Sequence, residues 1–252
     1  MNRTDPAFLL ARLKVLNDSF DSDPASSFGE KDIHKTLKYY IDKDKSHHEI
    51  RLGEFIVDVM NENGIFEIQT RAFERLVPKL EKLLGKNQVT VVYPIIKEKK
   101  LYWFDTEELE SRPPHKVPQK GKLSDALPEI SKLERFICNE NFVLRIYVIT
   151  ADEHRFLDGY GKDKKRRATK FSIYPTDILE TYELKSAEDY RILMPENLPE
   201  RFTAKEFSSA LQMKGRRAYF SLSFCMKMGF INRVGKQGNA YLYEKNATPE
   251  KE

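Results

Sequence analysis

The first hundred residues alternate between two hydrophobic periods. Apolar residues recur every three or four positions in 5–17 and in 31–41, which predicts two amphipathic helices. Segments 47–52, 54–60 and 65–70 are short and extended in pattern, and NENG separates the last two. Asn and Gly tolerate the positive φ angles of a tight hairpin, so we expect the second and third strands to be antiparallel neighbours.

The pattern then returns to a helix and a strand. Residues 72–84 carry one apolar stripe that ends at Gly85, a typical helix stop. The nearly continuous apolar run at 89–96 is typical of a central strand that is buried on both faces. Residues 30–96 therefore predict the order helix, three strands, helix, strand.

The later part of the chain predicts a second α/β region and a smaller C-terminal domain. Strands are expected at 101–105, 142–150 and 170–174, a loop at PPHKVPQKGK, and a helix at 123–137. After Pro195, Thr203 is placed to cap one helix, a second helix follows a short turn, and two short strands surround a glycine-containing tip. This order is the plan of a winged helix-turn-helix. The expected divisions are an N-terminal helix and linker (1–28), an α/β core (29–120), an α/β extension (121–194) and the winged helix (195–247).

Composition excludes several protein classes. The chain has 252 residues, 40% hydrophobic and 33% charged, with a net charge of +4, which predicts a soluble globular protein rather than a membrane protein or a disordered chain. Arg12 and Lys14 interrupt the N-terminal apolar stretch and no small-residue cleavage site follows, so we expect a cytoplasmic location. Cys138 and Cys225 form no CxxC or Cys/His motif, which predicts buried apolar side chains rather than a disulfide or a zinc site.

Polar residues interrupt the apolar strands of the predicted hairpin. Strand alternation places Asp58 on one face of the second strand, and Glu67 and Gln69 on one face of the third. A two-residue or a four-residue turn sets Asp58 opposite either Glu67 or Gln69, and the three side chains converge in both registers. Two adjacent carboxylates repel each other, which raises the pKa of one of them unless a cation neutralises the pair. Mg²⁺ is the natural counterion, since it prefers one or two carboxylates with water and phosphate oxygens. Glu49 and Glu30 are placed to approach the same edge. An ordinary solvated sheet face is the alternative.

The segment HHEIRLGEFIVDVMNENGIFEIQTRAF resembles the PD-(D/E)XK nuclease superfamily, in the branch where ExK has become ExQ, as in CoiA-like nucleases. The resemblance covers roughly residues 30–96 and implies a restriction-endonuclease-like core. It further implies that Asp58 and Glu67 bind Mg²⁺ or Mn²⁺, with the Ile68 carbonyl completing the shell. Gln69 takes the position of the motif lysine and supplies no charge, so Lys79 or Arg71 is expected to replace that cation.

Basic residues gather in two places that can bind phosphate. Residues 162–170 have a net charge of +5, and so do residues 196–245. The predicted DNA contacts are Lys164, Lys165, Arg166 and Arg167 in the first segment, and Arg216, Arg217, Arg233 and Lys236 in the winged helix. We expect the aromatic stripe that contains Tyr219 and Phe220 to belong to the core. His34, His115 and His154 are isolated in sequence, and adjacent His47 and His48 are expected to point to opposite faces of a strand, so no metal or catalytic motif is visible.

The sequence therefore predicts a metal-dependent DNA endonuclease whose C-terminal winged helix grips DNA. Two alternatives stay open: a DNA-binding regulator on a nuclease-like fold that has lost activity, and a protein-interaction scaffold. A homodimer is compatible with all three. No membrane partner is expected.

Overall fold

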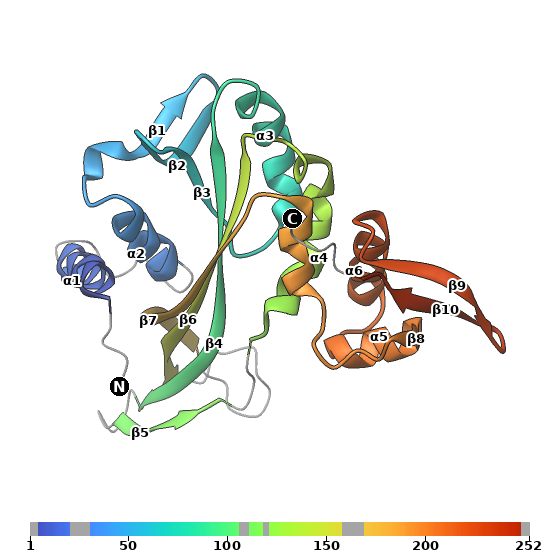
Figure 1. The fold of residues 1–252 in the computed structure, drawn as a ribbon. Helices are drawn as coiled ribbons and strands as arrows, with labels where there is room; N and C mark the ends of the chain where they lie inside the picture. The colour runs from blue at the N-terminus through green and yellow to red at the C-terminus, as the bar shows by residue number, and fades with distance from the viewer. Residues whose placement is uncertain (1–4, 21–30, 106–110, 118–120, 158–168, 248–252) are drawn as a thin grey trace. The chain divides into compact units, whose positions relative to one another are not determined.

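The computed structural model describes residues 5–20, 31–105, 111–117, 121–157 and 169–247. The chain is a mixed α/β protein that divides into two compact units (Figure 1). The first unit is built from Met1–Thr70, Lys86–Gly121 and Leu144–Tyr182, and the second from Arg71–Gly85, Lys122–Val143 and Glu183–Glu252. Each unit takes segments from both sides of residue 120, so the division of the chain into units differs from the domain boundaries expected from sequence.

A seven-stranded sheet organises the first unit. Its main path runs β1-β2-β3-β4-β6-β7, and β5 pairs with β4. The pairs β1–β2, β2–β3 and β4–β5 are antiparallel, whereas β3–β4 is parallel. The strands are β1 (His48–Leu52), β2 (Phe55–Asn61), β3 (Gly64–Ile68), β4 (Val89–Asp105), β5 (Ser111–Lys116), β6 (Phe142–Leu157) and β7 (Thr169–Leu184).

The predicted element order over residues 30–96 is confirmed. Helix α2 (Lys31–Ile41) precedes β1, β2 and β3, and a 3₁₀ turn, η3 (Phe73–Leu76), leads into α3 (Val77–Leu83) before β4. The β2–β3 hairpin is also confirmed, and it closes with the pair Asn61–Gly64. Gly64 has a φ of +105°, and a Cβ there would lie 2.6 Å from the Gln88 carbonyl oxygen, so this position needs glycine.

The sheet extends further than the sequence pattern predicts. The separate strand expected at 101–105 is wrong, because β4 continues unbroken through the charged segment KEKK. Ion pairs across the sheet compensate those charges: Lys97 Nζ lies 2.5 Å from Glu180 Oε1, and Lys99 pairs with buried Glu153. The expected loop at PPHKVPQKGK is wrong in part, since its first residues belong to β5.

Helix α1 (Pro6–Phe20) packs with α2 over the sheet, but through a different face from the predicted one. The apolar residues whose spacing predicts this helix are Phe8, Leu9, Leu13 and Leu16; Phe8 is buried, whereas the three leucines are exposed. Phe8, Ala11 and Val15 are buried instead. These three residues repeat at three and four positions and so form one face of the helix. Phe8 joins Ile33 and Leu37 of α2 and residues of β2, β3, β4, β6 and β7 in one apolar cluster.

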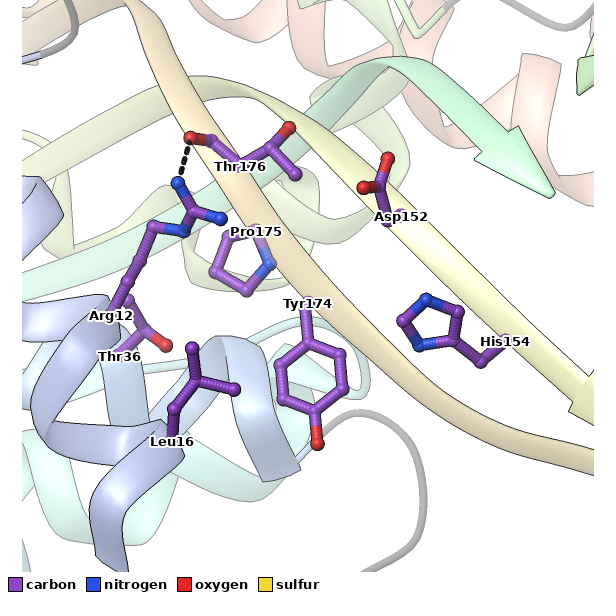
Figure 2. A pocket seen from close by; sticks show the side chains of 8 residues that line it. All are labelled: Arg12, Leu16, Thr36, Asp152, His154, Tyr174, Pro175 and Thr176. Carbon is purple, nitrogen blue, oxygen red and sulfur yellow. Dashed lines mark hydrogen bonds between the residues drawn. The ribbon is translucent and has the colours of Figure 1, made fainter. Parts of the chain in front are cut away.

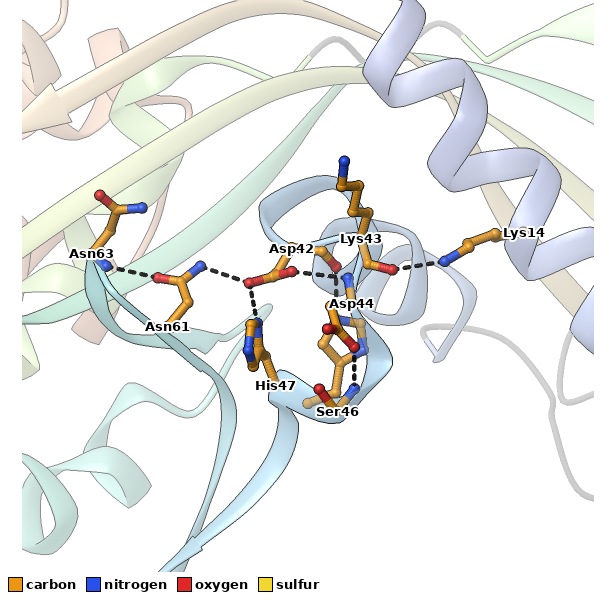
Figure 3. A network of polar contacts seen from close by, with 9 residues as sticks. Lys14, Asp42, Lys43, Asp44, Ser46, His47, Asn61 and Asn63 are labelled. Carbon is orange, nitrogen blue, oxygen red and sulfur yellow. Dashed lines mark hydrogen bonds and ion pairs between the residues drawn. The ribbon is translucent and has the colours of Figure 1, made fainter.

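A polar network fixes the connection between α2 and β1 (Figure 3). The Asp42 carboxylate accepts hydrogen bonds from the Asn61 side chain at 2.9 Å and from the Asp44 backbone N–H at 2.9 Å, and it contacts His47 Nδ1 at 2.7 Å. His48 Nε2 lies 2.8 Å from the Asp42 carbonyl oxygen. The two histidines therefore hold the start of β1 against Asp42, and Asn61 joins the same carboxylate to the end of β2.

The second unit contains mainly short helices and a three-stranded sheet with the order β8-β10-β9. Thr203 caps α5 as predicted, in a reciprocal capping box with Glu206. The expected burial of both cysteines is wrong for Cys138, which is exposed in the turn after η5, whereas Cys225 is buried. Beyond η3 and α3, the elements are η4 (Leu123–Ala126), α4 (Leu127–Ile130), η5 (Ser131–Phe136), η6 (Ala187–Leu193), β8 (Arg201–Thr203), α5 (Ala204–Leu211), α6 (Arg216–Lys227), β9 (Ile231–Gln237) and β10 (Ala240–Lys245).

Within the described residues, no helix combines the length and the apolar character that crossing a membrane requires.

Candidate functional site

The hairpin register settles which residue lies opposite Asp58. The last paired residues of β2 and β3 are Val59 and Phe66, so continuing the register by one position sets Asp58 opposite Glu67 rather than Gln69. On the other side of β2, the pairs His48–Val59 and Ile50–Val57 flank Glu49 and Asp58. Three acidic residues of β1, β2 and β3 therefore occupy one row across the sheet.

Asp58 lies where the ladder between β2 and β3 ends. Its Oδ2 atom accepts the Ile68 backbone N–H at 2.8 Å, so the carboxylate replaces the β2 carbonyl that would continue the ladder. The same oxygen lies 3.1 Å from His34 Nε2 on α2. Asp58 Oδ1 has no hydrogen-bond partner in the described part of the chain, and the Asp58 side chain keeps 20% of its exposure. One carboxylate oxygen is thus engaged and the other is available.

A second ion pair lies on the same side of α2. Lys38 follows His34 by one helical turn, and its Nζ atom donates to Glu49 Oε1 at 2.7 Å. The Lys38 side chain is only 9% exposed, whereas that of Glu49 is 70% exposed. Glu49 has a φ of +55°, a left-handed conformation that costs a non-glycine residue free energy. This conformation interrupts the β1–β2 pairing at the acidic row.

The charges around Asp58 favour its ionised form. Burial acts to raise the pKa of Asp58, but the contact with His34, the Ile68 N–H and the charge of Lys38 together hold that pKa below its usual value. Hydrogen bonding and charge from Lys38 likewise lower the pKa of Glu49. The arrangement therefore presents an ionised carboxylate with two basic side chains of α2 beside it.

Sequence reasoning missed His34 and Lys38. His34 was expected to be isolated, because its partner lies in another element and no short motif joins the two. The signal that could have found them is their spacing: two basic residues four positions apart on one helix face, directly before three acidic strands. Lys79 or Arg71 was instead expected to supply the positive charge that Gln69, at the motif lysine's position, lacks.

The other predicted residues have different surroundings. Glu67 is 4% exposed on β3 and lies beside Val91 of β4, and Ile68 is 2% exposed. The Gln69 backbone N–H donates to the Val92 carbonyl at 2.9 Å, which holds the end of β3 against β4. Lys79 lies on α3 and, like Arg71, belongs to the second unit. Glu30 lies outside the described residues.

The described residues contain no group of three or more His, Cys, Asp and Glu side chains placed to hold a metal ion. Asp58 and Glu67 with the Ile68 carbonyl are oxygen donors, and this donor set suits Mg²⁺, which usually keeps several waters.

The predicted DNA-binding residues of the second unit lie on its surface. Arg216 and Arg217 begin α6 and are exposed, as are Arg233 and Lys236 on β9. The Arg233 guanidinium lies 4.0 Å from the centre of the Tyr241 ring, and Lys236 Nζ lies 5.5 Å from the same ring. Tyr241 therefore holds both cations on one side of the β9–β10 hairpin. Lys164, Lys165, Arg166 and Arg167 lie outside the described residues.

The expectation that Tyr219 and Phe220 belong to the core is wrong. Tyr219 is 67% exposed and Phe220 is 47% exposed. Helix α6 instead buries Ala218, Leu222 and Cys225, which repeat at four and three positions and so form one face. The two aromatic rings fall outside that face and contact each other edge to face at 5.8 Å.

Comparison with known proteins places the chain in a family. A family model described as "Domain of unknown function (DUF8091)" matches residues 31–185, from α2 to the end of β7, and the chain belongs to this family. It is also similar to an uncharacterized protein of Treponema pallidum (strain Nichols), with 28% identity over 223 residues that cover 86% of this chain and 85% of the relative. No solved structure matches.

Proposed function

We propose that this chain is a metal-dependent DNA endonuclease that hydrolyses phosphodiester bonds. The observation that carries the proposal is the opening of the β2–β3 ladder at Asp58, with Glu67 directly opposite and the Asp58 carboxylate spanning the gap. The element order around this point supports it, since helix, three strands, helix and strand follow in the order that the PD-(D/E)XK resemblance implies.

Asp58 Oδ1 and Glu67 would hold Mg²⁺ or Mn²⁺, together with the Ile68 carbonyl. The bound ion would supply Lewis acidity toward a phosphate oxygen and lower the pKa of a water molecule. The Ile68 N–H and His34 position Asp58, because both bind Oδ2 and leave Oδ1 free. The Gln69 amide would orient water by hydrogen bonding.

Lys38 is a better source of the missing positive charge than Lys79 or Arg71. It lies in the same unit as Asp58, its side chain is 9% exposed, and its charge contributes to lowering the pKa of Asp58. A charge in such a poorly solvated position acts on its neighbours more strongly than an exposed one. In this role Lys38 stabilises the negative charge that develops on the phosphate during hydrolysis.

The second unit would bind the DNA backbone. Its order β8, α5, α6, β9, β10 agrees with a winged helix-turn-helix, in which the start of α6 and the β9–β10 hairpin contact DNA. The exposed Arg216 and Arg217 at the start of α6, and the cations held over Tyr241, support this role.

A DNA-binding protein without cleavage activity is the second candidate. Two observations favour it: His34 and the Ile68 N–H already compensate Asp58, and the described residues contain no three-ligand metal group. In this case Asp58 would be a structural residue that holds α2 and β3 together.

A plasmid-relaxation assay separates the two candidates. The wild-type chain should nick supercoiled DNA with Mg²⁺ or Mn²⁺ and lose this activity with a chelator. Asp58→Asn should abolish nicking, and Lys38→Met should reduce it by about 10²-fold or more while DNA binding is retained. Glu62→Gln, an exposed change in the same hairpin, is the matched control and should cleave normally.

DNA binding that weakens steeply as the salt concentration rises, without any metal-dependent cleavage, would establish the second candidate. Cleavage that survives in Asp58→Asn would mean that another part of the chain carries the activity. Absence of both binding and cleavage would refute both candidates and leave the interaction scaffold.

A further inference from the structure

A pocket of about 210 Å³ lies in the first unit, between the two helices and the last strands of the sheet (Figure 2). Four elements line it: α1, α2, β6 and β7. The lining residues are Arg12, Leu16, Thr36, Asp152, His154, Tyr174, Pro175 and Thr176. None of them is among the residues described above around Asp58 (His34, Lys38, Glu49 and Glu67), so this pocket is a separate candidate site.

Two opposite charges line this small pocket without pairing with each other. Figure 2 shows Arg12 and Asp152 on opposite sides of Pro175. Arg12 Nη1 donates to the Thr176 carbonyl oxygen at 2.9 Å, which fixes the guanidinium at the wall and leaves its other donors for a ligand. Asp152 forms no ion pair within the described residues; its carboxylate accepts a hydrogen bond from the Tyr102 side chain and keeps further acceptor positions for a ligand. The pocket therefore offers a cation on one side and an acceptor on the other.

Between the charges, the walls are aromatic and apolar. The rings of Tyr174 and His154 have their centres 5.6 Å apart, and Pro175 and Leu16 add apolar surface. His154 Nδ1 lies 3.0 Å from the hydroxyl of buried Ser172, and burial lowers the pKa of His154 despite the opposing charge of Asp152. His154 is therefore a neutral aromatic surface at neutral pH, with its Nε2 atom unengaged by any described residue.

The volume limits what can enter. It exceeds the roughly 150 Å³ of an apolar cavity that takes up benzene, and it is below the roughly 300 Å³ at which pockets for drug-sized ligands begin. One planar ring system fits, and a larger ligand would leave its polar substituents at the mouth, beside the partly exposed Arg12.

From these features we infer that the pocket binds a guanine nucleotide through its base, with the phosphate near Arg12. Tyr174 and His154 stack on the base, as aromatic side chains do in base-binding pockets. The carboxylate oxygens of Asp152 accept hydrogen bonds, so this residue selects a base edge that presents adjacent donors. Guanine presents an N–H and an NH₂ group side by side, whereas adenine presents a single NH₂ group beside an acceptor.

The base can come from a free nucleotide or from the end of a DNA strand, and calorimetric titration of the full chain separates these sources. The probes are GMP, AMP, inorganic phosphate and a 5′-phosphorylated trinucleotide of dG. GMP should bind roughly 10- to 100-fold more tightly than AMP, because the mismatched edge leaves an acceptor facing Asp152. Tighter binding of the trinucleotide would identify a strand end, and preference for GMP a free nucleotide.

Variants connect the binding to the named residues. Asp152→Asn should reduce the preference of GMP over AMP to less than about threefold, and Tyr174→Leu should weaken binding of both nucleotides more than Tyr174→Phe does. Glu200→Gln, an exposed change outside the pocket, is the control. Because the preference is a ratio within one folded variant, a loss of stability does not imitate the effect.

Three results would overturn the inference: no nucleotide binding at millimolar concentration, phosphate binding as tightly as GMP, or an unchanged preference in Asp152→Asn. All three are independent of DNA cleavage, so the inference stands or falls separately from the proposed nuclease.

Discussion

Replacing Asp58 by alanine or by asparagine tests whether this carboxylate holds the sheet together. Alanine removes the acceptor of the Ile68 N–H, which belongs to a residue that is 2% exposed. A buried backbone donor without a partner costs about 1–3 kcal/mol. The contact with His34 adds little, since the His34 side chain is 31% exposed and such pairs contribute about 0–1 kcal/mol. We expect Asp58→Ala to lower the free energy of unfolding by about 2–3 kcal/mol.

Asparagine should cost much less than alanine. Its amide oxygen can still accept the Ile68 N–H, so only the charge is lost, and we expect a decrease of about 1 kcal/mol. Urea unfolding followed by circular dichroism measures both values, with Glu62→Ala on the same hairpin as a control expected within about 0.5 kcal/mol of the wild type.

Equal destabilisation by alanine and asparagine would refute this reasoning, because it would mean that the Ile68 N–H does not depend on this acceptor. A cost below about 0.5 kcal/mol for alanine would refute it as well. If the prediction is correct, asparagine is the proper variant for the cleavage assay, since alanine would confuse lost activity with lost structure.

Three further predictions concern other parts of the chain. Arg216→Ala and Arg217→Ala should each reduce the slope of log affinity for DNA against log salt concentration by about 1. Arg201→Ala is the control and should change this slope less, because Glu244 already neutralises Arg201 at 2.8 Å. Filter binding at several salt concentrations measures the slope. Thr203→Ala removes the cap of α5 and should cost about 1 kcal/mol by urea unfolding, with a rescue of helix stability by Thr203→Ser. Burial raises the pKa of Asp32 to about 6, so the free energy of unfolding should fall by about 2–3 kcal/mol as pH rises from 4 through 6, and Asp32→Asn should abolish that fall.

The burial of Asp32 decides whether the free energy of unfolding rises or falls with pH. A carboxyl group whose pKa is higher in the folded than in the unfolded chain binds its proton more tightly when folded, so its stabilising effect is complete at low pH. The effect is lost as pH rises through the folded pKa, because the buried carboxylate then has to ionise. Unfolding of the wild type and of Asp32→Asn at pH 4 and pH 8 compares the two states directly. A wild type that loses no stability relative to the variant would contradict the assignment.

Local pattern was sufficient for the elements whose hydrophobic period and turn residues agree. Helix α2, the β2–β3 hairpin and the cap at Thr203 depend on neighbours within a few positions, and all three were predictable. The length of β4 was not predictable, because its charged segment KEKK indicates the end of a strand when only the local sequence is considered. Glu180 and Glu153, which lie on other strands, pair with the lysines of this segment. The buried face of α1 was likewise decided by what it packs against.

The sequence by itself determined the order of helices and strands around Asp58 and the tight turn between β2 and β3, because turn chemistry and alternation act over short distances. The register that sets Asp58 opposite Glu67 rather than Gln69 came from the structure. Only the tertiary structure decided that His34 and Lys38 join that row of carboxylates, and that Arg12, Asp152 and Tyr174 line one pocket. Side chains from separate elements meet through the packing of helices on a sheet, and this packing depends on contacts between segments that no local pattern relates.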